Sequence, residues 1–405
     1  MMALGADLRD YRLLWMGGIP ADVTSTAFVF ATPLIVLRMT DSAGVSGLVA
    51  GLLGLAVVVG RSPGGALADR YDRRHLLVAS QLGQAVIFGV MAAVLFAGST
   101  SVVLYAGLSM LVAFIASTND AAEDAAITQV VPQERLEQSH GEYQGRNQAA
   151  QLAGPALGGV LLGVGPGWVC AVAAVACVVA MVCDLLIQAD LSVEKSEEEN
   201  FAQSVMAGFS YVGRESVLRD ILGVQFFYNL AVAGLMFFMV IDLERAGVSA
   251  GVIGLLSGLL GAVGIAGAAI VPAVTKRLSF HQTQLFCVFL TVVSLATSAA
   301  LSGHWAMAIP LALSILIGPS AGAAVFARIS RSVPQERLGR VISVQALNAM
   351  GGSALSRPAV GWAYGGLGAV SGALPVAAAV ISLGWAVAFW RNDDDPQYHR
   401  PPERD

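Results

Sequence analysis

The sequence predicts an all-α integral membrane protein whose twelve transmembrane helices form two six-helix bundles. Composition is the first reason, because 56% of the 405 residues are hydrophobic and only 13% are charged, whereas soluble domains carry about 25% charged residues. Second, the apolar residues gather in stretches close to the ~20 residues that a membrane-spanning helix needs. Third, a six-residue segment occurs twice, half a chain length apart.

Twelve apolar stretches alternate with short polar segments, and each is predicted to be one transmembrane helix. An even number of spans places both termini on the same side of the membrane. The stretches cover approximately residues 12–37, 45–67, 76–97, 101–119, 144–165, 167–188, 219–241, 248–273, 281–301, 304–326, 340–365 and 369–390.

Lysine and arginine are distributed unevenly between the two sides of this topology. Of the 23, nineteen are assigned to the side of residues 70–74, Arg38 and Arg245 to the other side, and Arg61 and Arg357 to span interiors. Because Lys and Arg accumulate in short cytoplasmic loops, both termini are predicted to be cytoplasmic. The expected location is the inner or plasma membrane of a bacterial cell.

An internal repeat divides the chain. The segment VPQERL occurs at 131–136 and again at 333–338, an offset of 202 residues. The repeat predicts an N-terminal bundle (1–189) and a C-terminal bundle (219–391), related by a pseudo-twofold axis along the membrane normal. Between them, residues 190–218 are predicted to form a cytoplasmic linker, acidic at first and then an amphipathic helix. Residues 392–405 are predicted to be a cytoplasmic tail.

A glycine, an acid and three arginines follow the second span with a distinctive spacing: Gly65, Asp69, Arg70, Arg73 and Arg74. This pattern resembles the loop signature of major facilitator superfamily transporters, although Asp72 stands where the family has a glycine. The resemblance implies a cytoplasmic gate, in which Asp69 meets the start of the eleventh span and Gly65 lets the second span approach it. Topological anchoring alone is the alternative interpretation.

The fifth span contains Gly154, Pro155, Gly158 and Gly159, which resemble the antiporter motif of drug-exporting members of that superfamily. Ordinary small-residue packing is the alternative. Together with the VPQERL segment and the interfacial helix, the motif resembles the group that contains macrolide-efflux proteins and the enterobactin exporter. That resemblance implies a drug:proton antiporter.

Asp22 and Arg61 are the ionisable pair predicted to couple transport to protons. Asp22 lies ten residues beyond Arg12, about 15 Å along a helix and about half-way through a ~30 Å hydrocarbon core. Arg61 lies at a similar depth on the next helix. Charged groups at such depth usually face an interior pathway, so we expect the two to pair when Asp22 is ionised. A static salt bridge is the alternative.

Other polar residues in the spans are weaker candidates. Arg357, Gln225 and Asn229 are candidate substrate-cavity residues, although Arg357 can equally reach the outer interface and the two amides can join helices. Acids at the ends of the fourth and sixth spans are expected to be solvated or to pair with the arginine loop; they are Asp120, Glu123, Asp124 and Asp184.

The sequence contains no pattern typical of an enzyme. The five histidines are scattered without metal-ligand spacing, and no phosphate-binding glycine loop is present, so no cofactor or metal is expected. The predicted function is secondary active export of an amphipathic small molecule in exchange for protons, with lipid as surroundings, no nucleic-acid partner, and a monomer sufficient for the mechanism. A nutrient importer and a non-transporting membrane sensor or scaffold are the alternatives.

Overall fold

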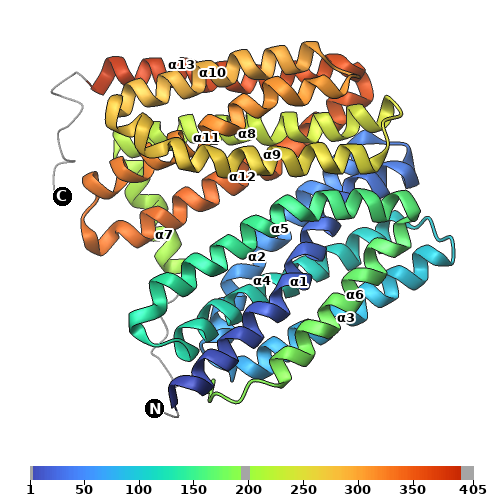
Figure 1. Cartoon of the computed structure of the whole chain (residues 1–405). Coiled ribbons are helices and arrows are strands. Elements are labelled where there is room, and N and C mark those ends of the chain that lie inside the picture. The colour runs from blue at the N-terminus through green and yellow to red at the C-terminus, as the bar shows by residue number, and fades with distance from the viewer. Residues whose placement is uncertain (1–2, 193–200, 394–405) are drawn as a thin grey trace. The chain divides into compact units, whose positions relative to one another are not determined.

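Twelve long helices and one short one form most of the molecule. The structure, a computed structural model, describes residues 3–192 and 201–393, and it contains no strand within them. The long helices correspond one for one to the predicted spans, so the predicted all-α membrane fold is confirmed (Figure 1). They are α1 (Ala3–Thr40), α2 (Ala43–Ala68), α3 (Arg73–Phe96), α4 (Val102–Val130), α5 (Leu136–Val164), α6 (Pro166–Leu185), α8 (Ser216–Arg245), α9 (Ala250–Arg277), α10 (Phe280–Ala300), α11 (Ala308–Ser332), α12 (Gln335–Leu367) and α13 (Ala373–Asp393).

Three short 3₁₀ helices complete the helical elements of the described residues: η1 (Gln133–Arg135), η2 (Trp305–Met307) and η3 (Gly368–Gly372). Most of the predicted acidic linker segment and most of the predicted tail lie outside the described residues.

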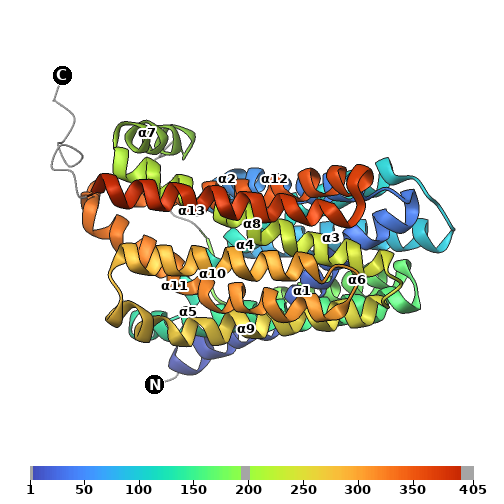
Figure 2. The same ribbon diagram turned by 90° about the horizontal axis from the view of Figure 1, so that it is seen from above.

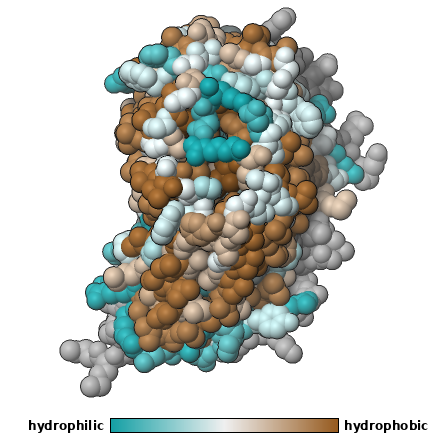
Figure 3. All heavy atoms as spheres, turned by 90° about the vertical axis from the view of Figure 1, so that its right-hand side faces the viewer, coloured by the Kyte–Doolittle hydropathy of each residue, from teal (hydrophilic) through white to brown (hydrophobic). Residues whose placement is uncertain are grey.

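Length and hydropathy support membrane insertion of these helices. Ten stretches of the described residues are long and apolar enough to cross a membrane, and one of them, 337–390, holds both α12 and α13. Helix α5 is not among the ten, because its first half is polar (LEQSHGEYQGRNQ). Apolar side chains cover much of the surface visible in Figure 3, where polar residues form separate patches.

Contacts between Cα atoms divide the chain into two compact units. Unit 1 comprises Met1–Asp41, Leu52–Glu198 and Val248–Gly261, and unit 2 comprises Ser42–Gly51, Glu199–Gly247 and Ala262–Asp405. The units therefore follow the two halves of the sequence, except that the first turns of α2 belong to unit 2 and the first turns of α9 to unit 1.

Each unit has the same internal arrangement. In unit 1, α1 packs against α4, α5 and α6, while α3 packs against α4 and α6. In unit 2, α8 packs against α11, α12 and α13, while α10 packs against α11 and α13. The second pattern is the first one repeated seven helices later, as the duplicated VPQERL segment predicts.

Glycines allow the first turns of α2 and α9 to pack backbone against backbone. In unit 2, a Cβ atom placed on Gly47 of α2 would lie 2.3 Å from the carbonyl oxygen of Arg357 in α12. In unit 1, a Cβ placed on Gly254 of α9 would lie 2.2 Å from the carbonyl oxygen of Pro155 in α5. Both distances are far shorter than any contact a Cβ makes, so these crossings require glycine.

The short helix α7 (Phe201–Arg214) packs on the start of α12, as Figures 1 and 2 show within unit 2. The guanidinium of Arg337 lies 5.0 Å from the ring centroid of Tyr211, and Val212 is buried in a core with Val341. On another side of the helix, the side chain of Phe209 is 52% exposed. One side of the helix therefore packs on α12, and another side carries an exposed apolar side chain.

We predict that Gly254→Leu disrupts the α5–α9 crossing, because the new side chain meets the backbone of Pro155. Overpacking of this kind costs about 1–3 kcal/mol. Heating the purified protein in detergent and measuring the fraction that stays monodisperse should show a lower midpoint temperature. Gly251→Leu is the matched control three residues earlier, because no atom lies within 4 Å of its added Cβ. Equal midpoints for the two variants would contradict the assigned packing.

Candidate functional site

Arg146 of α5 links two acidic residues inside unit 1. Its Nε donates to Oδ2 of Asp22 in α1 at 2.7 Å, and its Nη1 lies 2.8 Å from Oε1 of Glu123 in α4. The side chains of Arg146 and Glu123 are only 3% and 7% exposed, while that of Asp22 is 22% exposed. One guanidinium thus joins three helices, and Asp22 is the member of this ion triad that solvent reaches most readily.

The surroundings of Arg146 fit a guanidinium closely. Gly18 of α1 faces it, and a Cβ there would lie 2.1 Å from Nη1. The ring centroid of Tyr143, one turn earlier on α5, is 5.0 Å from Cζ of Arg146, a favourable distance for a cation–π interaction. Nη1 also donates to the carbonyl oxygen of Trp15 at 3.3 Å. These local contacts therefore hold the guanidinium in place, in addition to the two carboxylates.

A buried apolar cluster lies one or two turns from the triad, toward the end of the helices that carries Arg70, Arg73 and Arg74. We call that end the basic end and the cluster the basic-end cluster. Its members separate the triad from the loops at the basic end; they are Tyr11, Leu14, Ala68, Leu77, Ala122, Ala126, Ile127, Val130, Val131, Tyr143, Ile187 and Leu191.

Asp22 therefore pairs with Arg146, whereas the sequence predicted that it pairs with Arg61. Arg61 is exposed on α2, where it lies within electrostatic range of Asp120 and Asp124, both exposed on α4. Sequence position gave a similar depth for Asp22 and Arg61, but depth does not specify which face of a helix a side chain occupies. The predicted partner was wrong for this reason.

Sequence reasoning missed Arg146 and Glu123 as site residues. Arg146 lies two residues inside the predicted span 144–165, so it was grouped with the positive charges of the adjoining loop. Glu123 was expected at a solvated helix end, but it is 5% exposed. One signal in the sequence could have identified Arg146 as a site residue. It lies three residues beyond Tyr143 and eight before Gly154, which places it within a helix rather than at its start.

Asp72, Arg73 and Arg74 connect helix ends in unit 1. Asp72 caps α3 by accepting hydrogen bonds from the N–H groups of Arg74 and His75. Nη1 of Arg73 donates to the carbonyl of Ala125 near the end of α4 at 3.0 Å, and Nη2 of Arg74 donates to that of Ala189 at 2.8 Å. The departure from the family pattern at Asp72 thus has a structural role.

The remaining members of the loop signature are Gly65, Asp69 and Arg70. Asp69 and Arg70 are exposed at the end of α2. A Cβ placed on Gly65 would meet no atom within 4 Å, whereas one on Gly64 would lie 2.9 Å from Cα of Thr118 in α4. Gly64 is therefore the glycine that permits close packing here.

The antiporter-like motif of α5 packs against two helices. A Cβ on Gly154 or Gly158 would lie 2.5 Å from Thr26 Cβ or Ala27 O of α1, respectively. Gly159 instead faces α9. Pro155 lies within α5, which continues through it. The motif thus positions α5, and with it Arg146, against α1.

The predicted cavity residues mostly bond to backbone. Nη1 of Arg357 donates to the carbonyl oxygen of Ala50 at 3.0 Å, which ties α12 to the first turns of α2 in unit 2. Nδ2 of Asn229 donates to the carbonyl of Gln225, one turn earlier in the same helix, at 2.8 Å. These contacts give Arg357 and Asn229 structural partners.

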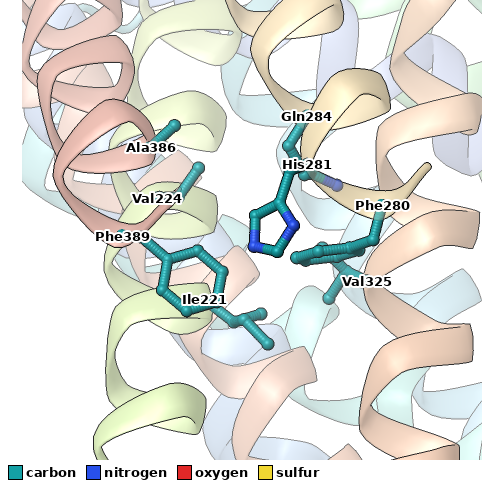
Figure 4. Close-up of a pocket in the computed structure, with 8 residues that line it drawn as sticks. All are labelled: Ile221, Val224, Phe280, His281, Gln284, Val325, Ala386 and Phe389. Atoms are coloured by element: carbon teal, nitrogen blue, oxygen red, sulfur yellow. The ribbon is translucent and has the colours of Figure 1, made fainter. Parts of the chain in front are cut away.

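A small pocket lies within unit 2 between α8, α10, α11 and α13. The ring of His281 points into it, beside Phe280 and Phe389 (Figure 4). The two VPQERL segments are 202 residues apart. At the same offset, three acidic residues of unit 1 correspond to apolar residues that line this pocket. Asp22 corresponds to Val224, Glu123 to Val325 and Asp184 to Ala386.

Within the described residues, no group of three or more His, Cys, Asp or Glu side chains is arranged to hold a metal ion.

Comparison with known proteins gives one family and several solved structures. The family model described as Major Facilitator Superfamily matches residues 14–357. A bacterial homologue of the human lysosomal transporter Spinster, inward-facing and unoccupied, has 13% identity and a TM-score of 0.75, covering 98% of this chain and 99% of that one. No curated protein gives a significant match.

Two further solved structures illustrate the range of similar proteins. A bacterial homologue of the iron transporter ferroportin, in an inward-facing state, has 16% identity and a TM-score of 0.66, covering 94% of this chain and 99% of that one. The nucleoside transporter NupG has 12% identity and a TM-score of 0.69, with the same coverages. At these identities the similarity concerns the fold alone.

We predict that Arg146→Gln strongly destabilises the protein, because it leaves Glu123 buried without its cation. Removing one partner of a buried ion pair typically costs 3–5 kcal/mol. The midpoint temperature in detergent should fall, whereas Arg61→Gln, at an exposed site, should change it little. Adding Asp22→Asn and Glu123→Gln to Arg146→Gln should recover part of the loss. No recovery would contradict the electrostatic explanation.

Asp72→Ala should lower stability by about 0.5–2 kcal/mol, the usual value of a helix N-cap. The N–H groups of Arg74 and His75 lose their acceptor, whereas Asp72→Asn keeps an acceptor oxygen and should lose less. Thermal midpoints of the two purified variants test this order. A glycine at this position, as in the family pattern, should fall between them.

Proposed function

Because the chain belongs to the Major Facilitator Superfamily, a family of secondary transporters, we propose that it exports an amphipathic small molecule in exchange for protons. The observation that carries the proposal is the buried triad of Asp22, Arg146 and Glu123. The wider class of secondary transporter rests on the family; the proton, the direction and the cargo are our proposals.

The triad supports proton coupling through its net charge. Two carboxylates and one guanidinium carry one negative charge, and such charges are rare and usually functional in membrane-spanning segments. A proton on Asp22 would neutralise the group and weaken its charge-assisted bond to Nε. The bond between α1 and α5 would then depend on whether Asp22 holds a proton, so proton binding can bias a conformational equilibrium.

The direction of transport rests on the α5 motif. Its glycines allow α5 to approach α1 and α9 at backbone distance, and the motif resembles that of exporting antiporters. The fold does not identify the cargo, since the similar structures include a nucleoside transporter and a POT family peptide transporter. We propose an antibiotic, a siderophore or another secondary metabolite as cargo because of the resemblance to macrolide and enterobactin exporters.

We predict that Asp22→Asn abolishes proton-driven transport, because the asparagine cannot exchange a proton. Cells that express the protein should accumulate less of at least one compound in a panel of labelled amphipathic antibiotics and siderophores. Collapsing the proton gradient should remove this difference, and Asp22→Asn should reduce it at least tenfold.

Glu137→Gln, an exposed residue of the same α5 helix that carries Arg146, is the matched control and should transport normally. Greater accumulation in expressing cells would instead identify an importer. Reconstituted protein that moves neither protons nor any compound of the panel would favour the sensor or scaffold.

A further inference from the structure

Asp184, in the last turn of α6, is a buried acid without a hydrogen-bond donor. Four acidic residues are buried in the described part of the chain: Asp10, Glu123, Asp184 and Asp242. Asp10 accepts from two backbone N–H groups, Glu123 from Arg146, and Asp242 from the hydroxyl of Tyr364 and the N–H of Gly303. Asp184 is 5% exposed and accepts from no described residue.

Asp184 is close to the ion triad. Glu123 and Arg146 lie within electrostatic range of its carboxyl. Adjacent glycines of α1 bring the two regions together, because a Cβ on Gly17 would lie 2.7 Å from Cβ of Cys183 and one on Gly18 would meet Arg146. The last turn of α6 and the guanidinium therefore lie against the same turn of α1.

Only 5% of Asp184 is exposed to solvent. Ile187 and Leu191, which follow Asp184 in the chain, are 1% exposed and belong to the basic-end cluster. Helix α3 packs along α6, and its buried side chains include the neutral Ser80, Gln81 and Gln84. The other charged groups near the triad, Arg61, Asp120 and Asp124, are exposed.

The charges of this group do not balance if every acid is ionised. Asp22, Glu123 and Asp184 against Arg146 alone would leave two negative charges among side chains that are largely buried. An uncompensated buried carboxylate is very unfavourable and is normally neutralised by a proton. Arg146 is already bound to Asp22 and Glu123, so the proton belongs on Asp184.

We propose that Asp184 holds a proton in this state and is a second proton-exchanging carboxyl of the transporter. This inference rests on the proposed proton coupling. When a proton arrives at Asp22, its bond to Nε of Arg146 weakens, and the guanidinium can compensate an ionised Asp184. Asp184 then releases its proton to water. One proton enters and one leaves, and the group keeps one negative charge throughout.

The bonding of Arg146 is consistent with this exchange. Its Nη2 is buried and has no hydrogen-bond partner among the described residues, although Nε and Nη1 have theirs. A donor thus stays available for a third carboxylate. Arg146 would bind Asp22 and Glu123 before the exchange, and Glu123 and Asp184 after it.

Infrared spectroscopy of the full-length protein in lipid nanodiscs at neutral pH tests the proposal. A protonated carboxylic acid gives a C=O stretching band that ionised carboxylates lack and that shifts in heavy water. We expect such a band in the wild type and its loss in Asp184→Asn. Asp190→Asn, at an exposed position, is the matched control and should keep it. A band that persists in Asp184→Asn, or is missing from the wild type, would overturn the proposal.

Isotope labelling gives a test that needs no variant. Aspartate carrying a heavy carbon isotope in its carboxyl group should shift the band of the wild-type protein, whereas labelled glutamate should not. A shift with labelled glutamate would assign the proton to Glu123 and overturn the proposal.

If the proposed proton coupling were wrong, the experiments would give a different result from the one expected if the Asp184 assignment were wrong. In that case the aspartate band would be present, but transport in proteoliposomes would not respond to a proton gradient. With coupling intact, Asp184→Asn should lower proton-driven transport at least tenfold while the thermal midpoint stays near that of the wild type, because asparagine resembles the neutral acid in shape.

Discussion

The bond that Arg146 makes with Asp22 and Glu123 determines how α1, α4 and α5 meet. Lipid cannot solvate a guanidinium, so the protein has to supply its counter-charges. The neighbouring residues meet this requirement: Gly18 leaves room for the group, and Tyr143 offers the face of its ring. The glycines of the α5 motif then bring this helix close enough to α1 for the bond to form.

Much of the fold follows from the sequence because lipid imposes a simple rule on it. Each span must be apolar for about 20 residues, so hydropathy located the helices, and the repeated VPQERL segment indicated a repeated arrangement. Helix α5 is not among the ten long apolar stretches because its first half is polar, but its apolar second half was enough to predict a span at 144–165.

The charged site was harder to predict, for three physical reasons. Depth along a helix can be counted from the sequence, but the face that a residue occupies depends on packing, which is why Arg61 was paired with Asp22. Arg146 looked like a loop charge because it lies near the start of its span. Asp184 was expected to be solvated or to pair with the arginine loop because it lies near a helix end, but the residue is only 5% exposed. By contrast, Asp72 immediately precedes α3, and an acid at that position is a readable capping signal.

The duplicated arrangement has chemically different contents in its two copies. Where unit 1 holds Asp22, Glu123 and Asp184, the corresponding positions of unit 2 hold Val224, Val325 and Ala386, which line a small hollow. Protonation of an acid can therefore weaken a bond between helices at these positions in unit 1, whereas the apolar residues at the corresponding positions of unit 2 cannot ionise. A molecule built from two similar halves thus carries ionisable acids at these positions in one half and apolar residues in the other, so a symmetric scaffold can give an asymmetric response.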